Sequence, residues 1–159
     1  MTPNVRKFAL TAHITFSVGW LGTVAGFLVL ANTGLTSQDS ATVRGTYFGM
    51  MLIGWYVIVP FCLASLITGV IQALATKWGL LRHYWVLYKF LITIVSTLIL
   101  FGFTKTLSRL GEMAGDTTLS LANLRDLSPV VHARLAVVAL LVTTILSVYK
   151  PWGKRKSSE

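Results

Sequence analysis

The stretch KWGLLRHYWVLYKFLITIVSTLIL, residues 77–100, carries a lysine inside an otherwise apolar run. Lys89 follows Arg82 by seven residues, and an ammonium group at that depth in a bilayer is costly unless it reaches water, the interface or a polar partner. Because successive residues of a helix are rotated by about 100°, Thr93 and Ser96 lie within about 40° of Lys89 on the same face. This polar stripe predicts a membrane helix whose polar face lines the interior of a bundle.

The composition of the whole chain agrees with a membrane protein. The 159 residues are 54% hydrophobic and only 12% charged, which is too apolar for an ordinary soluble domain. We therefore expect one transmembrane domain that comprises residues 1–159. The net charge of +9 fits basic residues that contact anionic lipid headgroups. The sequence contains no zinc-type Cys/His cluster and no phosphate-binding loop. It also lacks the combination of aromatic and basic residues that forms a nucleic-acid-binding surface, so we expect no nucleic-acid partner. The single cysteine, Cys62, excludes an internal disulfide.

Four apolar runs are long enough to cross about 30 Å of hydrocarbon. They predict an all-α, up-down bundle of four membrane helices, at about residues 8–31, 46–76, 83–104 and 129–149. The first run is longer than the apolar core of a signal peptide, so we expect it to be retained as a helix. The second run is longer than a straight crossing needs, and Pro60 near its middle predicts a kink.

The predicted connections differ greatly in length. The short basic turn at residues 77–83 makes the second and third helices antiparallel neighbours. The longest connection is a predicted surface loop at residues 105–128. Its leucines indicate a short helix that lies on the membrane surface; they are Leu119, Leu121, Leu124 and Leu127.

Basic side chains concentrate at one end of the predicted bundle. The N-terminus, the short turn and the C-terminal tail carry eight bases against one acid, Glu159; the bases are Arg6, Lys7, Lys77, Arg82, Lys150, Lys154, Arg155 and Lys156. The other two loops, with the adjoining start of the fourth helix, carry Arg44, Lys105, Arg109, Arg125 and Arg134 against Asp39, Glu112, Asp116 and Asp126. This asymmetry predicts that both termini are cytoplasmic. Aromatic anchors are expected at the same boundary; they are Trp78, Tyr84, Trp85, Tyr149 and Trp152.

Polar residues converge in the cytoplasmic half of the predicted bundle. His13 follows Lys7 by six residues, so at 1.5 Å per residue His13 and Lys89 lie at similar depths, roughly 10 Å from the interface. The second and fourth helices add polar side chains at nearby depths, namely Ser65, Thr68, Gln72, Thr143, Thr144 and Ser147. A polar pocket between the four helices would satisfy all of them. Alternatively, the hydroxyl groups bond to their own helices and Lys89 extends to the headgroups.

A histidine inside a helical bundle is a usual axial ligand of heme iron. We therefore interpret His13 as the ligand of a b-type heme, with Trp20 on almost the same helix face. Lys89 would pair with a heme propionate or, when deprotonated, ligate the iron, and Thr93 and Ser96 would extend the lining. In a second interpretation, His13 and Lys89 form a proton or ion relay without a cofactor.

A third histidine raises the question of a second metal site. His132 lies three residues into the predicted fourth helix from the outer side, and Met50 and Met51 lie at comparable depth in the second helix. Histidine and methionine together ligate the iron of some hemes, so a second site on His132 is one interpretation. The other interpretation is that the methionines fill space in the core.

Gly22 and Gly26 form a GxxxG motif on the side of the first helix roughly opposite His13. If His13 faces the interior of the bundle, these glycines face away from it. They would then pack a second copy of the chain in a homodimer, or they would admit the second or fourth helix more closely.

Three short motifs can be compared with known families: HITFSVGWLG at 13–22, YWVLYKFLIT at 84–93 and, more loosely, SVYKP at 147–151. They resemble a group of small bacterial membrane proteins that includes the CopD-type copper resistance proteins and the HemJ-type protoporphyrinogen oxidases. Two segments, SLITGVIQALATKWG at 65–79 and the loop at 105–128, follow neither subfamily closely.

The resemblance to the HemJ-type enzymes implies heme b binding by His13, a role of Lys89 in activity, and a location in the bacterial plasma membrane. Copper transport is disfavoured, because the first helix has no Met or further His beside His13 to offer copper(I) a soft ligand. We therefore expect electron transfer or oxidation of a heme precursor, with electrons passed to a quinone or a respiratory partner. The alternatives are a cofactor-free accessory or transport protein and a structural subunit that assembles through Gly22 and Gly26.

Overall fold

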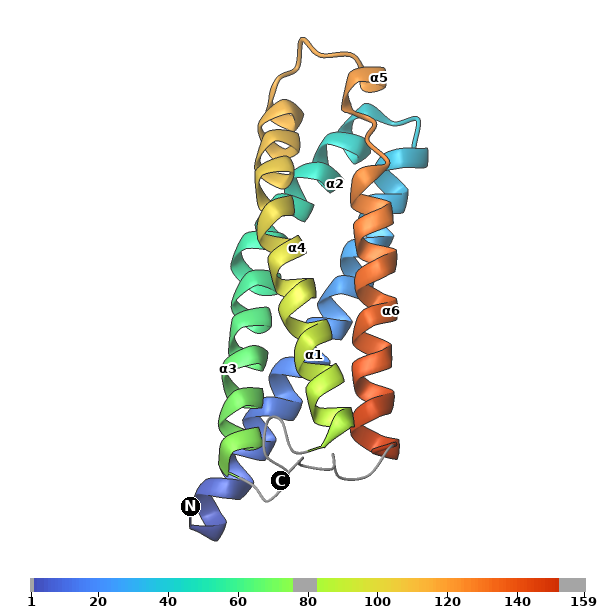
Figure 1. The fold of residues 1–159 in the computed structure, drawn as a ribbon. Coiled ribbons are helices and arrows are strands. Elements are labelled where there is room, and N and C mark those ends of the chain that lie inside the picture. Colours follow the sequence, from blue (N-terminus) through green and yellow to red (C-terminus); the bar gives the residue numbers. More distant parts are fainter. Residues whose placement is uncertain (1, 76–82, 152–159) are drawn as a thin grey trace.

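The computed structural model describes residues 2–75 and 83–151, and these residues form helices and no strand (Figure 1). In chain order the elements are α1 (Pro3–Thr36), α2 (Ser40–Ile53), the π-helical turn η1 (Gly54–Ile58), α3 (Val59–Ala75), α4 (Tyr84–Gly115), α5 (Leu121–Leu124) and α6 (Ser128–Tyr149). Within the described ranges, four helical segments are long and apolar enough to cross a membrane: α1, the segment from α2 through η1 to α3, α4, and the segment from α5 to the end of α6. The chain is therefore an all-α, multi-pass four-helix bundle, as the sequence predicts.

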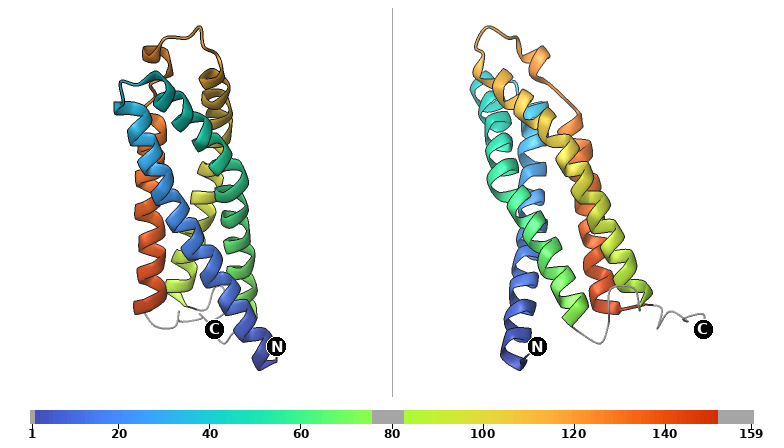
Figure 2. Two further views of the ribbon diagram at one scale, coloured as in Figure 1. Left: turned by 180° about the vertical axis from the view of Figure 1, so that it is seen from behind. Right: turned by 60° about the vertical axis from the view of Figure 1, so that its left-hand side comes forward.

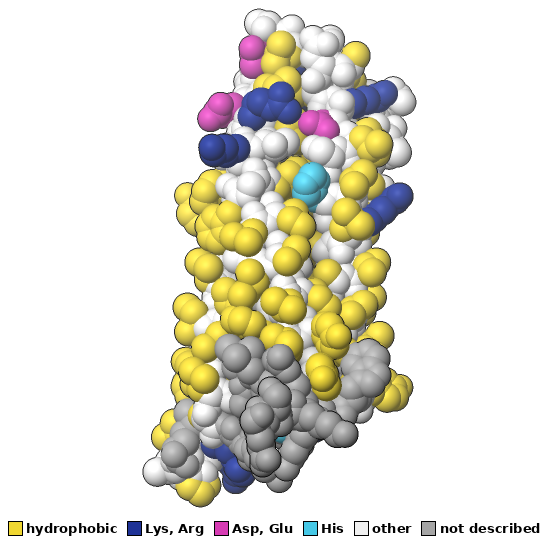
Figure 3. Space-filling view, viewed as in Figure 1, with side chains coloured by type: hydrophobic (Ala, Val, Ile, Leu, Met, Phe, Trp, Pro, Cys, Tyr) yellow, Lys and Arg dark blue, Asp and Glu magenta, His cyan; other side chains and the backbone are white. Residues whose placement is uncertain are grey.

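The four long segments alternate in direction. The start of α1, the end of α3, the start of α4 and the end of α6 lie together at one end of the bundle, here called the inner end (Figure 1). The opposite end, which carries α5, is called the outer end. Figure 3 shows a broad apolar band along this face of the bundle, with charged side chains of both signs near the outer end and basic side chains also visible near the inner end. The predicted anchors Trp78 and Trp152 lie outside the described residues, as do the bases of the short turn and the tail bases Lys154, Arg155 and Lys156.

Helix α4 is longer than the sequence pattern predicts, because residues 105–115 are helical instead of part of a loop. Leu107, Leu110 and Ala114 recur at spacings of three and four and are buried, so one face of this extension packs against α2. The prediction of a surface loop at 105–128 is therefore wrong over its first part. Helix α1 likewise extends beyond both ends of the predicted span at 8–31.

A short helix does form in the remaining connection, and it is held against the end of the bundle. Leu124 of α5 is fully buried. Next to it, the guanidinium of Arg44 in α2 donates hydrogen bonds to the backbone oxygens of Ala114 at 3.2 Å, Asp116 at 2.5 Å and Leu119 at 2.6 Å. These charge-assisted bonds fasten the connection between α4 and α5 to α2.

The predicted kink in the second membrane segment is built around a π-helical turn. Pro60 has no N–H to donate to the carbonyl of Tyr56 four residues earlier. The turn just before it, η1, is wider than an α-helical turn, and the N–H of Val59 bonds to the carbonyl of Gly54 five residues earlier. Helices α2 and α3 consequently run in different directions (Figure 1).

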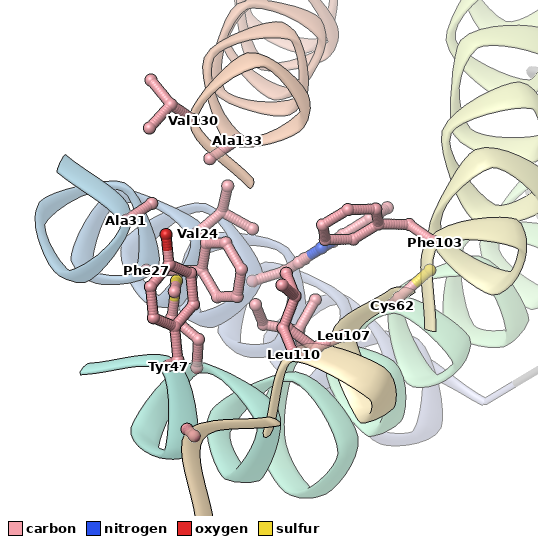
Figure 4. Close-up of a cluster of buried hydrophobic side chains, with 14 of the residues drawn as sticks. Val24, Phe27, Ala31, Tyr47, Cys62, Phe103, Leu107, Leu110, Val130 and Ala133 are labelled. Carbon is pink, nitrogen blue, oxygen red and sulfur yellow. The ribbon is translucent and has the colours of Figure 1, made fainter. Parts of the chain in front are cut away.

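Large apolar side chains fill the outer half of the bundle. Val24, Phe27 and Ala31 recur along one face of α1 and are buried, and Figure 4 shows them directed toward Tyr47 of α2 and Phe103 of α4. In the inner half, α1 packs beside α3 and α4 beside α6 (Figure 2). The core is thus concentrated at the outer half, and polar residues lie toward the inner end.

The close approach of α2 and α4 predicts a stability difference between two glycines of α4. A Cβ atom at Gly111 would lie 2.8 Å from Cβ of Met51, whereas one at Gly102 meets nothing within 4 Å. Gly111→Ala should therefore lower the free energy of unfolding in detergent micelles by about 1–3 kcal/mol. Gly102→Ala should be neutral or stabilising by up to about 1 kcal/mol. Equal effects in an SDS unfolding titration would contradict the packing described.

Candidate functional site

An inner-end cavity of about 920 Å³ lies between α1, α3, α4 and α6. This volume is near the upper end of the range for small-molecule sites. Its polar lining comprises Arg6, His13, Ser17, Ser65, Gln72, Lys89, Thr93, Thr143, Thr144, Ser147 and Lys150. The polar pocket predicted from matched helical depths is therefore present, and each of its four helices contributes to it.

His13 and Lys89 meet inside this cavity. Nζ of Lys89 on α4 lies 3.4 Å from Nε2 of His13 on α1. Both side chains are half-buried. Lys89 therefore finds a polar partner within the bundle, which offsets part of the cost of placing an amine at this depth. The pairing of these two residues agrees with the sequence prediction, while their chemical roles stay predictions.

The other ring nitrogen of His13 is oriented by α3. Nδ1 lies 3.1 Å from the hydroxyl oxygen of Thr68, and that hydroxyl donates its hydrogen to the backbone oxygen of Ala64 at 2.6 Å. Because the hydrogen of Thr68 is engaged there, its oxygen accepts from His13, so Nδ1 carries the ring hydrogen. The lone pair of Nε2 is then directed toward Lys89 within the cavity.

Gly69 lets α3 approach His13 closely, and the sequence analysis did not identify it. A Cβ atom at this position would lie 3.1 Å from Cε1 of His13, which is tighter than ordinary van der Waals contact. A second polar contact joins the same two helices, since Ser17 and Ser65 lie 2.8 Å apart, oxygen to oxygen. A glycine directly after Thr68 in an apolar helix was the available sequence signal, because glycine there costs helical stability without a packing reason.

Several other predicted hydroxyls bond to their own helices. Thr93 donates to the backbone oxygen of Lys89 at 2.8 Å, one turn earlier in α4. Thr143 and Thr144 donate to Leu140, and Ser147 donates to Thr143, along α6. For these side chains the alternative of local bonding holds, and they line the cavity with their donor hydrogens already engaged.

Gln72 is the exception among the uncharged polar groups of the cavity. Its side-chain Nε2 is buried and has no hydrogen-bond partner among the described residues. Arg6 and Lys150, near the inner ends of α1 and α6, add two cationic side chains to the same lining. The cavity thus offers an unmet amide donor together with cations. Such a lining favours an occupant that carries acceptor or anionic groups.

Ser96 and His132 lie in a different place from the other predicted site residues. They line an outer cavity of about 470 Å³ between α1, η1, α4 and α6, whereas Thr93 lines the inner-end cavity. The buried Trp20 forms part of both walls. The polar stripe of α4 therefore serves two cavities, and Ser96 is not grouped with His13.

The structure does not assemble the second heme site that pairs His132 with methionine. Neither Met50 nor Met51 lines the outer cavity; Met50 is fully buried in the core, and Met51 packs at Gly111. Over residues 2–75 and 83–151, no group of three or more His, Cys, Asp or Glu side chains is placed to hold a metal ion. Because a heme needs as little as one ligand from the protein, this finding concerns metal ions held by several side chains and does not bear on heme binding.

No protein-family model matches this chain, and no curated protein sequence and no solved structure matches it. The resemblance of its motifs to the CopD-type and HemJ-type proteins therefore stays a prediction.

The orientation of His13 predicts a difference between two variants of Thr68. Thr68→Val removes the acceptor of Nδ1–H and should lower the free energy of unfolding in detergent by about 1 kcal/mol. Thr68→Ser retains a hydroxyl group, so it should lose less. The measurement is reversible SDS unfolding of both variants beside the parent protein. If valine and serine prove equally tolerated, the bond to His13 contributes nothing to the fold.

Proposed function

We propose that this chain is a membrane-embedded redox protein that binds one b-type heme through His13. The observation that carries the proposal is the placement of the imidazole: Nδ1 lies 3.1 Å from the hydroxyl oxygen of Thr68, and Nε2 lies 3.4 Å from Nζ of Lys89 in the inner-end cavity. Histidines that ligate metals are usually held in this way. A hydrogen bond at the second nitrogen fixes the tautomer and makes the ligating nitrogen more basic.

The residues around the inner-end cavity fit such a group. Its volume of about 920 Å³ lies in the range of cofactor sites. Arg6, Lys89 and Lys150 supply cations for two propionates, and the unpaired amide of Gln72 supplies a donor. Trp20 adds a buried aromatic residue to the lining of the cavity.

Lys89 must respond to a bound heme, because its amine faces the same nitrogen that would ligate the iron. Lys89 would then hold a propionate or, when deprotonated, ligate the iron. A heme bound here would supply one-electron transfer. In an oxidation of a heme precursor of the HemJ type, Lys89 would act in its neutral amine form and accept a proton released by the substrate.

A cofactor-free proton relay is the second candidate function. It is favoured by the chain of contacts that runs from Lys89 through His13 to Thr68. Thr68, however, donates to the carbonyl of Ala64, which cannot pass a proton onward. Beyond it, the side chains of the outer half are mostly apolar in the described residues, and the cavity there offers few groups that could carry a proton. A relay along this route would therefore end inside the bundle, and we place the heme first.

The setting we propose is the bacterial plasma membrane, with the inner end in the cytoplasm and a quinone or respiratory protein as redox partner. The basic residues Arg6, Lys7 and Lys150 at the inner end support this orientation. Homodimers through α1 fit the same arrangement, since Cβ atoms at Gly22 and Gly26 would meet nothing within 4 Å in the chain itself.

The heme proposal predicts a Soret band that depends on one histidine. Protein purified from heme-replete cells should show the band, and pyridine hemochrome analysis should identify heme b. His13→Ala should abolish the band, because it removes the axial ligand. His132→Ala should retain it, and this makes His132 the matched control. A folded but colourless parent protein, or equal loss of colour in both variants, would remove the proposed ligation.

The position of Lys89 predicts an effect on the reduction potential of the heme. Lys89→Met should keep the Soret band and lower the potential in a redox titration, because a nearby cation stabilises the more negative, reduced form. Lys89→Arg keeps the charge and should shift the potential less. Loss of heme-precursor oxidation with the colour retained would assign Lys89 to catalysis. Equal potentials in all three proteins would show that Lys89 does not act on the heme.

A further inference from the structure

The outer cavity is almost entirely apolar and opens toward the hydrocarbon of the bilayer. Its polar lining, within the described residues, consists of Ser96, His132 and the indole of Trp20. Val95, Ile99 and Leu135 line the cavity and are also 53%, 54% and 66% exposed on the outside of the bundle. Because these side chains belong to the lipid-facing band, an occupant of about 470 Å³ would enter from the membrane. The cavity therefore selects a lipid-soluble molecule.

His132 supplies this apolar space with a defined hydrogen-bond acceptor. Its Nδ1 lies 2.8 Å from the backbone oxygen of Ser128, and a carbonyl oxygen only accepts, so Nδ1 carries the ring hydrogen. In the tautomer with its hydrogen on Nδ1, Nε2 is an acceptor on the opposite side of the imidazole. The ring stacks on Phe103, with centroids 4.2 Å apart and planes inclined by 18°. These two contacts fix the orientation of the ring, so it cannot turn to offer Nδ1–H to a ligand. A ligand that bonds to His132 must therefore donate a hydrogen to Nε2.

The positions of the two polar side chains along the bundle match an amphiphile with one polar ring. His132 follows the start of α6 at Ser128 by four residues, so it lies roughly 6 Å below the outer end of that helix. Ser96 lies seven residues before Phe103 on α4, roughly 10 Å further into the bundle. A polar ring near His132 would thus sit close to the outer interface, and an attached apolar chain would have hydrophobic walls along its length.

We propose that the outer cavity binds the headgroup of an isoprenoid hydroquinone, with a phenolic hydroxyl donating to Nε2 of His132. The oxidised quinone offers only acceptor oxygens, so its affinity is lower at a site whose fixed group is an acceptor. The proposal deepens the redox function proposed above by giving its lipid-soluble partner a place, but binding at His132 does not itself require heme. A phospholipid acyl chain is the competing occupant, and it needs no bond to His132.

The decisive experiment compares two ligands on two proteins. A short-chain ubiquinol and its dimethyl ether, which lacks the hydroxyl donors, are titrated anaerobically by calorimetry into nanodiscs that hold the full chain, with empty nanodiscs subtracted. On the parent protein the hydroquinone should bind about tenfold more tightly than the ether. On His132→Leu the hydroquinone should fall to the affinity of the ether, and the affinity of the ether should not change. This non-additivity is the signature of one shared contact.

A second pair of variants tests the cavity itself. Ala136 lines the outer cavity, whereas Val138 on the same helix does not and is exposed. Ala136→Phe should abolish hydroquinone binding by filling the space, and Val138→Phe should leave it unchanged. The proposal is wrong if both ligands bind the parent protein with equal affinity, or if His132→Leu binds the hydroquinone as tightly as the parent does. Both outcomes can be measured even if Ala136→Phe does not fold. If the purified protein contains no heme but binds the hydroquinone as predicted, only the heme proposal is wrong. If it contains heme but does not bind the hydroquinone as predicted, only the proposal for the outer cavity is wrong.

Discussion

A lysine buried among membrane helices needs a partner, and the contact between Lys89 and His13 meets that need. The contact joins α1 to α4 across the inner-end cavity, while the bond from His13 to Thr68 joins α1 to α3. The imidazole thus ties together three helices with its two nitrogens. Gly69 makes the arrangement possible, because any side chain there would press on the imidazole ring. The polar character of the inner half, and the functional proposals built on it, depend on this constraint.

The outer half of the bundle contains most of the apolar core, and the inner half contains the polar cavity. Apart from its own cavity, the outer half contains most of the buried apolar side chains, and the extension of α4 adds more of them. Arg44 bonds the connection after α4 to α2, so the outer half supplies most of the contacts that stabilise the bundle. The inner half gives up packing density and keeps a cavity lined by polar groups. Trp20 stands at the boundary, with its indole in the walls of both cavities. A chain with two such spaces, one polar and basic and one apolar, is organised to hold two different small molecules.

The sequence predicted the helical bundle and the meeting of His13 and Lys89, because hydrophobic length and distance from the interface are counted along the chain. It misplaced the end of α4, where residues 105–115 look polar but bury Leu107, Leu110 and Ala114 on one face. It also grouped Ser96 with Lys89, because helical periodicity shows that both residues lie on one face of α4. Periodicity does not show that this face borders two separate cavities, with Trp20 in the lining of both. The sequence did not reveal Gly69, because this glycine matters only through the close approach of α3 to His13 on α1. The contact between the hydroxyl of Thr68 and the ring of His13 likewise depends on how the two helices pack.

The most direct test of the account is solid-state nitrogen NMR of the heme-free chain in lipid bilayers, with ¹⁵N in the histidine rings and lysine amines. The account predicts that His13 carries its hydrogen on Nδ1, that Nε2 is unprotonated, and that Nε2 shows a through-space correlation with Nζ of Lys89. The opposite tautomer, or a Lys89 amine that correlates with water and lipid headgroups instead of with His13, would contradict it.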